Sequence, residues 1–341
     1  MNNWLKESRD QLLETMVDFL WQQWSSLGVA GLKKSNDNRI IDLEALLLFS
    51  LSICRYDPRL FDEIIDWLFQ NGHLVNVQRL QQIQKKYNFN CGPQLSAIAE
   101  LLAQQSKYKL KWNGLANKYF QEEVEPLFYA SDGTVLPCPQ KNLSEPVFLK
   151  HGIKRGLINL RGYSQSFDIN NPTRLLLKLR SLLGINARAE ILCLLASEPE
   201  IQPNEAARQL SYYQKTIQTT LVEMSLSGVI SSRNNKKKKY YRLNPGILDN
   251  LLKPKSLSPI WVFWPELLII TEKIWQKISQ LSQIDIDDLL LNSEVLKLLK
   301  TLENNYPNNI ITKTYEAKNP NDKTLNSILL TLSKNLLTKL E

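Results

Sequence analysis

The chain has 341 residues, 43% of them hydrophobic, and its formal net charge at pH 7 is +8. Length and composition exclude a largely disordered protein and predict two or three domains with buried cores. The four cysteines stand far apart, with no CxxC pair and no histidine nearby, which argues against a zinc site and a disulfide framework and favours reduced thiols in a cytoplasmic protein.

Residues 1–125 carry apolar side chains at helical spacing. From Trp4 to Leu27 the apolar positions form one stripe, and acidic residues occupy the opposite side. Asp57-Pro58 and Asn71-Gly72 are typical helix breakers. The sequence therefore predicts an α-helical domain over residues 1–125, with helices over 4–27, 40–55, 59–70, 75–87 and 94–105.

No membrane segment is predicted. Acidic residues interrupt the first 20 residues, so no secretory leader is expected. The most apolar run, Ile260 to Ile270, is too short to span a bilayer and contains Pro265 and Glu266. We therefore expect a soluble protein that does not enter a membrane.

Residues 126–172 are rich in glycine and proline, and this density of breakers predicts an irregular basic connector. The stretch from His151 to Gly162 is basic, but it lacks the Gly-Lys-Ser/Thr ending of a phosphate-binding loop. We interpret it as a basic loop able to contact a phosphate backbone. Thr173 to Leu183 then has the spacing of a basic amphipathic helix.

The stretch from Ala187 to Leu243 combines helix, turn and charge signals. A helix is predicted over Ala187 to Ser197, because the residue before Pro199 is disfavoured in the α region. Pro203 suits the first position of a second helix, which is expected to stop at Ser211-Tyr212. Two helices therefore precede a short turn.

A third helix and a hairpin follow this turn. Ile217, Leu221 and Met224 recur at i, i+4 and i+7, and Gly228 is placed to end the helix. Apolar and aromatic runs on either side of an Asn-rich tip predict a β-hairpin, with Lys236 to Lys239 on its tip and returning strand. Three helices followed by a basic hairpin predict a winged helix-turn-helix.

Four features of residues 187–243 match one class of known proteins. They are the Glu-Ala-Ala-Arg-Gln-Leu of the second helix, the polar start of the third, its Ser-Gly-Val-Ile exit, and the lysine-rich wing that ends in Tyr-Arg-Leu. In these features the region resembles bacterial winged-helix transcription regulators of the MarR and ArsR class, without the metal-sensing cysteine pair of ArsR proteins. Residues 12–29, 56–68 and 175–192 also look like uncharacterised bacterial helix-turn-helix proteins found beside nucleotidyltransferase-like genes in toxin–antitoxin or defence arrangements.

Positive charge gathers on both sides of this region. Residues 150–188 contain eight basic residues against Asp168 alone, and residues 231–255 contain eight against Asp249 alone. Acidic residues outnumber basic ones over residues 1–70. Because the charge coincides with a helix-turn-helix pattern, it favours DNA as the anionic partner.

The resemblance implies that the third helix enters the major groove. Gln214 and Gln218 are then expected to read adenine, and Lys215 guanine. The predicted DNA-binding residues are Tyr213, Gln214, Lys215, Thr216, Gln218 and Thr219 on the recognition helix, and Arg188, Arg208, Arg233, Lys236, Lys237, Lys238, Lys239 and Arg242 on the wing and for backbone contacts.

Residues 254–341 return to a helical pattern and are predicted to form a C-terminal α-helical domain. The segment Pro259 to Gln280 has more apolar surface than one helical stripe needs, so it either packs between two elements or forms a partner interface. Asp285 to Leu302 and Thr324 to Leu340 are predicted as further amphipathic helices.

Catalytic chemistry is not indicated. The two histidines, His73 and His151, belong to no nucleophile or metal motif, and the carboxylate pair Glu122-Glu123 does not share a helical face. We predict no catalytic residue, no metal and no cofactor, and expect that the protein is not an enzyme.

The predicted fold class is mainly α, a multi-domain helical protein with a central winged helix-turn-helix over residues 173–253. The predicted function is a sequence-specific, double-stranded DNA-binding transcription regulator, a repressor acting as a homodimer because paired half-sites multiply specificity. The alternative is an antitoxin-like or adaptor protein whose helical flanks bind a partner protein. The acidic residues 1–70 and the apolar segment 259–280 motivate that alternative.

Overall fold

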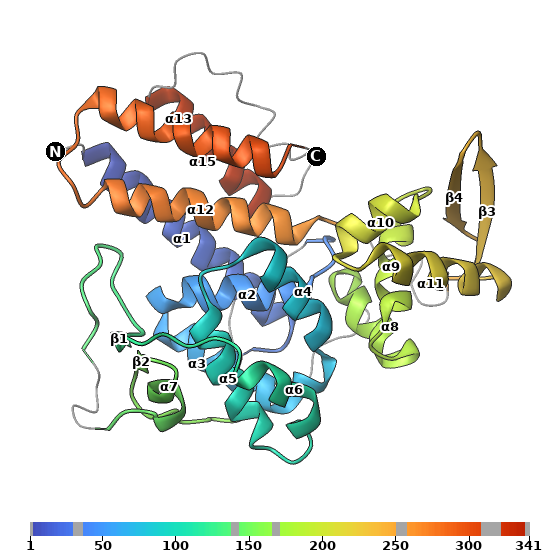
Figure 1. Cartoon of the computed structure of the whole chain (residues 1–341), viewed down its shortest axis with the longest axis horizontal. Coiled ribbons are helices and arrows are strands. Elements are labelled where there is room, and N and C mark those ends of the chain that lie inside the picture. Colours follow the sequence, from blue (N-terminus) through green and yellow to red (C-terminus); the bar gives the residue numbers. More distant parts are fainter. Residues whose placement is uncertain are drawn as a thin grey trace.

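The computed structural model describes residues 3–29, 37–137, 143–165, 171–249, 258–307 and 322–337, and the chain is mainly helical with two small two-stranded sheets (Figure 1). Its elements are α1 (Asn3–Ser26), α2 (Leu43–Ile53), α3 (Pro58–Asn71), α4 (Val77–Tyr87), α5 (Gly92–Ala103), α6 (Lys109–Ala116), β1 (Glu125–Pro126), α7 (Pro146–Lys150), β2 (Ile153–Lys154), α8 (Leu175–Leu183), α9 (Ala187–Ser197), α10 (Pro203–Leu210), α11 (Gln214–Leu226), β3 (Ile230–Asn235), β4 (Lys238–Leu243), α12 (Trp264–Leu281), α13 (Asp288–Asn305) and α15 (Asp322–Leu337). None of the helices in these ranges is long and apolar enough to cross a membrane.

Side-chain caps explain where the first helices begin. Asp42 accepts a hydrogen bond from the Ala45 backbone N–H at the start of α2. Asp57 caps α3 in the same way, and Pro58 occupies the first helical position. Asn76 caps α4. These side chains bind N–H groups that have no partner inside the helix, and they therefore fix where each helix begins. The observed starts of α2, α3 and α4 lie within three residues of the predicted ones.

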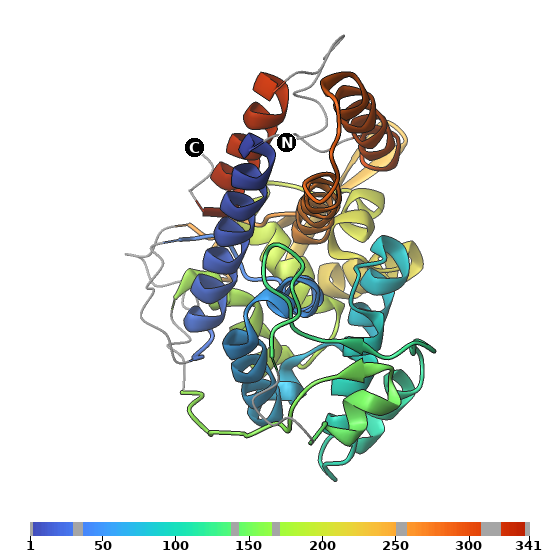
Figure 2. The same cartoon turned by 90° about the vertical axis from the view of Figure 1, so that its left-hand side faces the viewer.

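The first and last helical segments share one hydrophobic core. Figure 2 shows α1 beside α15 and α12, and buried residues of α1 to α6 and of α12, α13 and α15 belong to a single cluster. The ring of Phe19 lies 5.4 Å from that of Trp264, whose indole Nε1 donates to the Ile40 carbonyl at 2.7 Å. The described parts of residues 1–125 and 254–341, which are separate in sequence, therefore form one helical body.

Helix α12 accounts for the surplus of apolar residues over 259–280. Leu267 and Leu268 are buried, and so are Ile274, Trp275 and Ile278. The helix contacts α1 and α2 on one side and α13 on another. Of the two alternatives for this segment, packing between elements is therefore confirmed.

Glu272 of α12 is a carboxyl group inside this core. Its Oε1 accepts hydrogen bonds from the Asn90 backbone N–H at 2.8 Å and from Gln276 Nε2 at 2.9 Å. Burial raises the pKa of Glu272 from 4.5 to about 7, and the hydrogen bonds only partly offset that effect. The folded protein therefore binds this proton more tightly than the unfolded chain does.

This shift predicts a stability that depends on pH. The contribution of neutral Glu272 is fully present below pH 4.5 and is lost as the pH rises through about 7. Glu272→Gln is therefore expected to raise the free energy of unfolding at pH 8 by about 3 kcal/mol, at 1.36 kcal/mol per pKa unit, and to converge with the wild type in acid. Denaturant unfolding at pH 8 and pH 4.5 measures this, with exposed Glu303→Gln as the control. An equal effect at both pH values would contradict the assignment.

The segment 126–172 also contributes to the core of the body. Leu127, Phe148 and Ile153 are buried in it, and β1 pairs with β2 in parallel. The guanidinium of Arg155 lies between aromatic rings, 5.3 Å from the centroid of Phe148.

Two basic residues of this segment point inward. Arg155 also pairs with Asp62 at 2.7 Å, and buried His151 lies 2.8 Å from a carboxylate oxygen of Glu100. The expectation that the loop from His151 contacts a phosphate backbone is therefore wrong for these two side chains, because both are already enclosed by protein groups.

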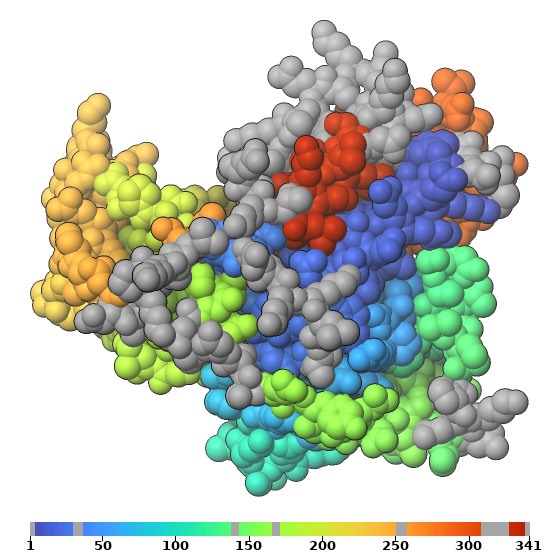
Figure 3. Space-filling model, turned by 180° about the vertical axis from the view of Figure 1, so that it is seen from behind, coloured from blue at the N-terminus to red at the C-terminus, as the bar shows by residue number. Residues whose placement is uncertain are grey.

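A second hydrophobic core lies under α8 to α11 and the β3–β4 hairpin. Ile191, Leu210, Ile217 and Leu221 are buried in it. Tyr241 of β4 also exchanges two backbone hydrogen bonds, of 2.8 and 2.9 Å, with Ile201, which precedes α10. We call residues 187–249 the hairpin module. In the space-filling view it forms one end of the molecule, in yellow and gold (Figure 3).

The hairpin is regular up to its turn. Strands β3 and β4 are antiparallel from the pair Ile230–Leu243 to the pair Asn235–Lys238. The tip therefore consists of Lys236 and Lys237, and the asparagines that were expected there lie in β3. Lys236 has φ +54°, the left-handed conformation that the first central residue of such a tight turn requires.

Candidate nucleic-acid interface

Helix α11 presents a polar outer side. Its inward positions, Ile217, Thr220, Leu221 and Met224, are buried against α9 and α10. The six residues predicted on the recognition helix are all exposed and lie together on its N-terminal half: Tyr213, Gln214, Lys215, Thr216, Gln218 and Thr219.

A short turn joins α10 to α11. Ser211 ends α10 in the left-handed conformation with φ +57°, and Tyr213 precedes α11 without a capping hydrogen bond from its side chain. Tyr213 is 67% exposed. The first turn of α11 is therefore exposed and lacks a side-chain cap, and the start of a helix is a place that favours contact with an anion.

The four consecutive lysines are exposed on the hairpin. Within the residues that the structure describes, no carboxylate lies within ion-pair distance of Lys236 to Lys239. Lys239 has its Nζ 5.1 Å from the ring of Tyr241, which leaves the charge uncompensated. Arg242 is also exposed, and its Nε donates to Ser231 Oγ at 3.1 Å. The hairpin is thus strongly cationic.

The three predicted arginines outside this set are already paired. Arg188 contacts Glu223 at 2.6 Å, Arg233 contacts Glu200 at 2.7 Å, and Arg208 contacts Glu205 at 2.7 Å. Arg208 also lies 3.4 Å from Glu266 and 4.9 Å from the centre of the Phe263 ring. A phosphate would have to compete with these carboxylates for the three arginines, whereas the lysines of the hairpin have no such competitor among the residues described.

A buried network of charges joins the hairpin module to the helical body. Arg180 of α8 contacts Glu44 of α2 at 2.7 Å and Glu190 of α9 at 2.6 Å. Arg79 of α4 contacts Glu44 at 2.7 Å and Asp42 at 2.5 Å. All five side chains are fully buried. Burial alone would raise the pKa of Glu44, but the two guanidinium groups outweigh it and hold that pKa well below its ordinary value.

The same network fixes the corner between α10 and α11. Arg79 Nε donates to the Leu210 carbonyl at 2.7 Å, and Asn76 Nδ2 donates to the Tyr212 hydroxyl at 2.8 Å. Both donors belong to the α4 region of the body. The position of α11 relative to α4 is therefore set by hydrogen bonds at the corner.

Sequence reasoning missed the network. Its signal is a charged residue at a core-facing position of an apolar helix: Glu44 among the leucines of α2, and Arg180 among those of α8. Such a residue needs a buried partner. The partners lie more than 100 residues apart in some pairs, so no local motif identifies them.

The described cysteines are not part of this interface. Cys54, Cys91 and Cys193 are free and buried, and burial raises the pKa of each thiol. Cys138 lies outside the described residues. In the described part of the chain, no three His, Cys, Asp or Glu side chains are placed to hold a metal ion.

None of the protein-family models, curated proteins or solved structures compared with this chain matches it. A functional assignment therefore depends on the geometry of the chain itself.

Proposed function

We propose that residues 173–253 form a winged helix-turn-helix that binds double-stranded DNA sequence-specifically, and that the protein is a transcription regulator acting as a repressor. The observation that carries this proposal is the pairing of an exposed polar helix, α11, with an exposed hairpin that carries four uncompensated lysines on the same module. A helix fits the major groove, about 12 Å wide, and cations beside it neutralise the flanking phosphates.

The exposed residues suit distinct parts of a duplex. Gln214 and Gln218 have amides that pair with adenine, and Lys215 can donate to guanine. Thr216 and Thr219 supply a hydroxyl and a methyl group at the same surface. The wing lysines contact phosphates without reading bases. A homodimer with two such helices would read two half-sites, and this part of the proposal follows from the symmetry of DNA recognition.

The alternative of an antitoxin-like or adaptor protein has less support. It depended partly on the apolar residues over 259–280, and α12 buries those residues inside the helical body. A second polypeptide in stoichiometric amount, co-purified from the native host, remains the result expected only under that alternative.

The proposal is tested by incubating the full chain with a pool of duplexes of random sequence and sequencing those that it binds. A defined motif is expected, and DNA crosslinked to the protein in its own host should be enriched in it. Uniform recovery of all duplexes would reject sequence-specific recognition.

The double variant Gln214→Ala and Lys215→Ala tests the recognition helix on the selected motif. We expect a loss of about 1–3 kcal/mol for each lost base contact, and little change on unrelated DNA, because base contacts carry the discrimination. Fluorescence anisotropy on both duplexes measures this. Gln283→Ala with Lys300→Ala, exposed on the helical body, is the matched control. Equal weakening on the two duplexes would contradict the role given to α11.

A further inference from the structure

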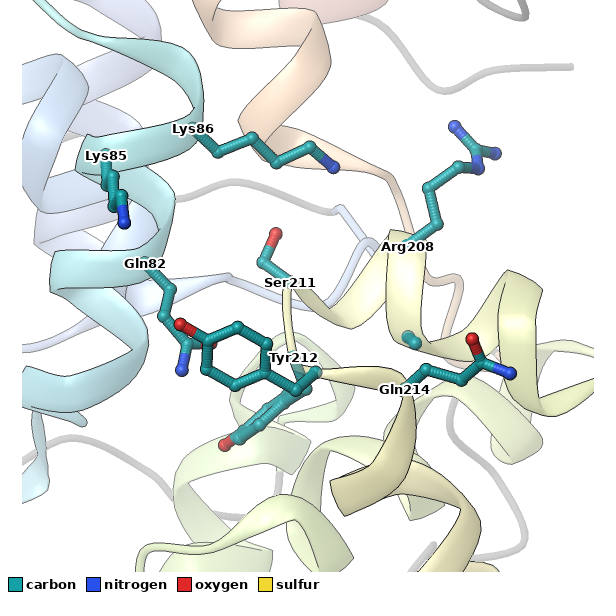
Figure 4. A pocket seen from close by; sticks show the side chains of 9 residues that line it. Gln82, Lys85, Lys86, Arg208, Ser211, Tyr212 and Gln214 are labelled. Carbon is teal, nitrogen blue, oxygen red and sulfur yellow. The ribbon is translucent and has the colours of Figure 1, made fainter.

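A cationic cleft separates α4 from the corner between α10 and α11. Its volume is about 510 Å³, and its lining includes Lys85, Lys86, Arg208, Tyr213 and Gln214. Figure 4 shows the two lysines on the α4 side and Arg208 and Gln214 on the opposite side. Three cations and no carboxylate occur among the lining residues that the structure describes.

Two of these cations, Lys85 and Lys86, form no ion pair in the described ranges, although the carboxylate of Glu266 also attracts the charge of Lys86. Arg208 is held by Glu205 and Glu266. Lys85 and Lys86 are exposed, and in the described ranges neither has a carboxylate within ion-pair distance. Lys86 Nζ lies 4.9 Å from the ring of Tyr87, a contact that leaves its ammonium charge available.

The cleft and the hairpin lie at opposite ends of α11. Gln214, the first residue of α11, lines the cleft, while the last turn of α11 leads through Gly228 into β3 (Figure 1). A helix of 13 residues is about 20 Å long, which exceeds the width of a major groove, about 12 Å, so the two ends of α11 can approach the two backbones that border the groove. Cations at both ends are thus placed to meet both flanking strands.

The cleft has a fixed geometry. Arg79, on the same helix as the two lysines, donates to the Leu210 carbonyl at 2.7 Å, and Asn76 binds the Tyr212 hydroxyl. Lys85 and Lys86 therefore keep one position relative to α11.

We propose that Lys85 and Lys86 bind backbone phosphates of the same duplex that α11 reads, on the side opposite the hairpin. The inference rests on the proposed function and extends it, because it makes the helical body part of the DNA interface. The contacts are electrostatic and independent of base sequence.

The test compares three full-length proteins: wild type, Lys85→Gln/Lys86→Gln, and the control Lys109→Gln/Lys300→Gln, which removes the same charge from exposed sites on the body. Affinity is measured over a salt series on two forms of the selected duplex. One form extends about one helical turn past the end read by Gln214, and the other stops there.

We expect the Lys85/Lys86 variant to flatten the slope of log affinity against log salt by about 1–2 on the long duplex, at roughly 0.9 per phosphate. No such change is expected on the short duplex or in the control. Ethylation of the phosphates at the end of the long duplex near Gln214 should interfere with binding of the wild type and should no longer interfere with binding of the variant.

The outcomes separate the inference from the proposed function. A wild type that binds DNA, with an unchanged slope in the variant on the long duplex, overturns the inference alone. A wild type without DNA binding overturns both. Pyrophosphate binding lost in the variant, measured by calorimetry, together with an unchanged slope, assigns the cleft to a small phosphate ligand and rejects DNA. A lower melting temperature with an unchanged slope reduces the lysines to stabilising the last turn of α4.

Discussion

Arg180→Met is expected to lower the free energy of unfolding by about 3–5 kcal/mol, because it leaves the buried carboxylate of Glu190 without a cation and that of Glu44 with Arg79 alone. The guanidinium of Arg180 contacts Glu44 and Glu190, and all three side chains are fully buried. The cost of removing the Glu190 carboxylate from water is then no longer offset by an ion pair. Denaturant unfolding of the full chain, followed by circular dichroism, measures the change.

A matched control exists in the hairpin module, eight residues further along the chain. Arg188 forms an equally short pair with Glu223, but both side chains are about half exposed. Arg188→Met should therefore change stability by at most about 1 kcal/mol. If the two variants lose the same stability, burial of the network has no special role.

A second variant keeps the Arg180 experiment informative if the single variant fails to fold. Glu190 is paired with Arg180, so Glu190→Gln in the Arg180→Met background removes one uncompensated charge. Partial recovery of stability is expected, since buried networks lose most when only one partner is removed. No recovery would mean that the arginine acts through packing alone.

The parts of the fold that local signals determine could be predicted. Pro203 begins α10 and Gly228 follows α11, and α9 has the bounds that its spacing and Pro199 indicated. The exposed and buried sides of α11 also agree with the periodicity. In each case the deciding residues lie within one or two helical turns of each other.

Long-range pairing could not be predicted. The sequence predicts that Arg155 lies in an exposed basic loop. In the structure its guanidinium is enclosed by Asp62 and by three phenylalanine rings, which come from different segments of the chain. The place of α12 within the helical body likewise depends on its contacts with α1 and α2, which are more than 200 residues away in the sequence. For the candidate site, the four lysines of the hairpin could be identified from the sequence. Lys85 and Lys86 could not, because only the fold shows that they line the same cleft as Gln214.

The hairpin carries the largest expected effect on binding. Lys236 and Lys237 form its two-residue turn, and Lys238 and Lys239 begin the returning strand, all exposed. Their side chains are exposed and have no carboxylate partner in the ranges described, so they add little to folding. Lys236 even adopts a left-handed conformation that most residues avoid. The proposed contact with DNA phosphates would account for this concentration of charge.

Changing Lys236 to Lys239 together to glutamine should flatten the slope of log affinity against log salt by about 2–4, because each phosphate contact releases counterions worth roughly 0.9 in that slope. Glutamine removes the charge and keeps a polar side chain that is only slightly shorter than that of lysine. The weakening should be similar on every DNA sequence, since phosphates carry no base identity. Fluorescence anisotropy over a salt series, on the selected motif and on unrelated DNA, measures both effects.

Two comparisons decide what the result means. A control with Lys109, Lys118, Lys154 and Lys300 changed to glutamine loses the same four charges from exposed positions on the helical body, and its slope should stay near that of the wild type. The melting temperature of the hairpin variant should also hardly change. If the two quadruple variants flatten the slope equally, only net charge matters. If neither does, the hairpin lies outside the interface, and the protein-binding alternative becomes the better account of the chain.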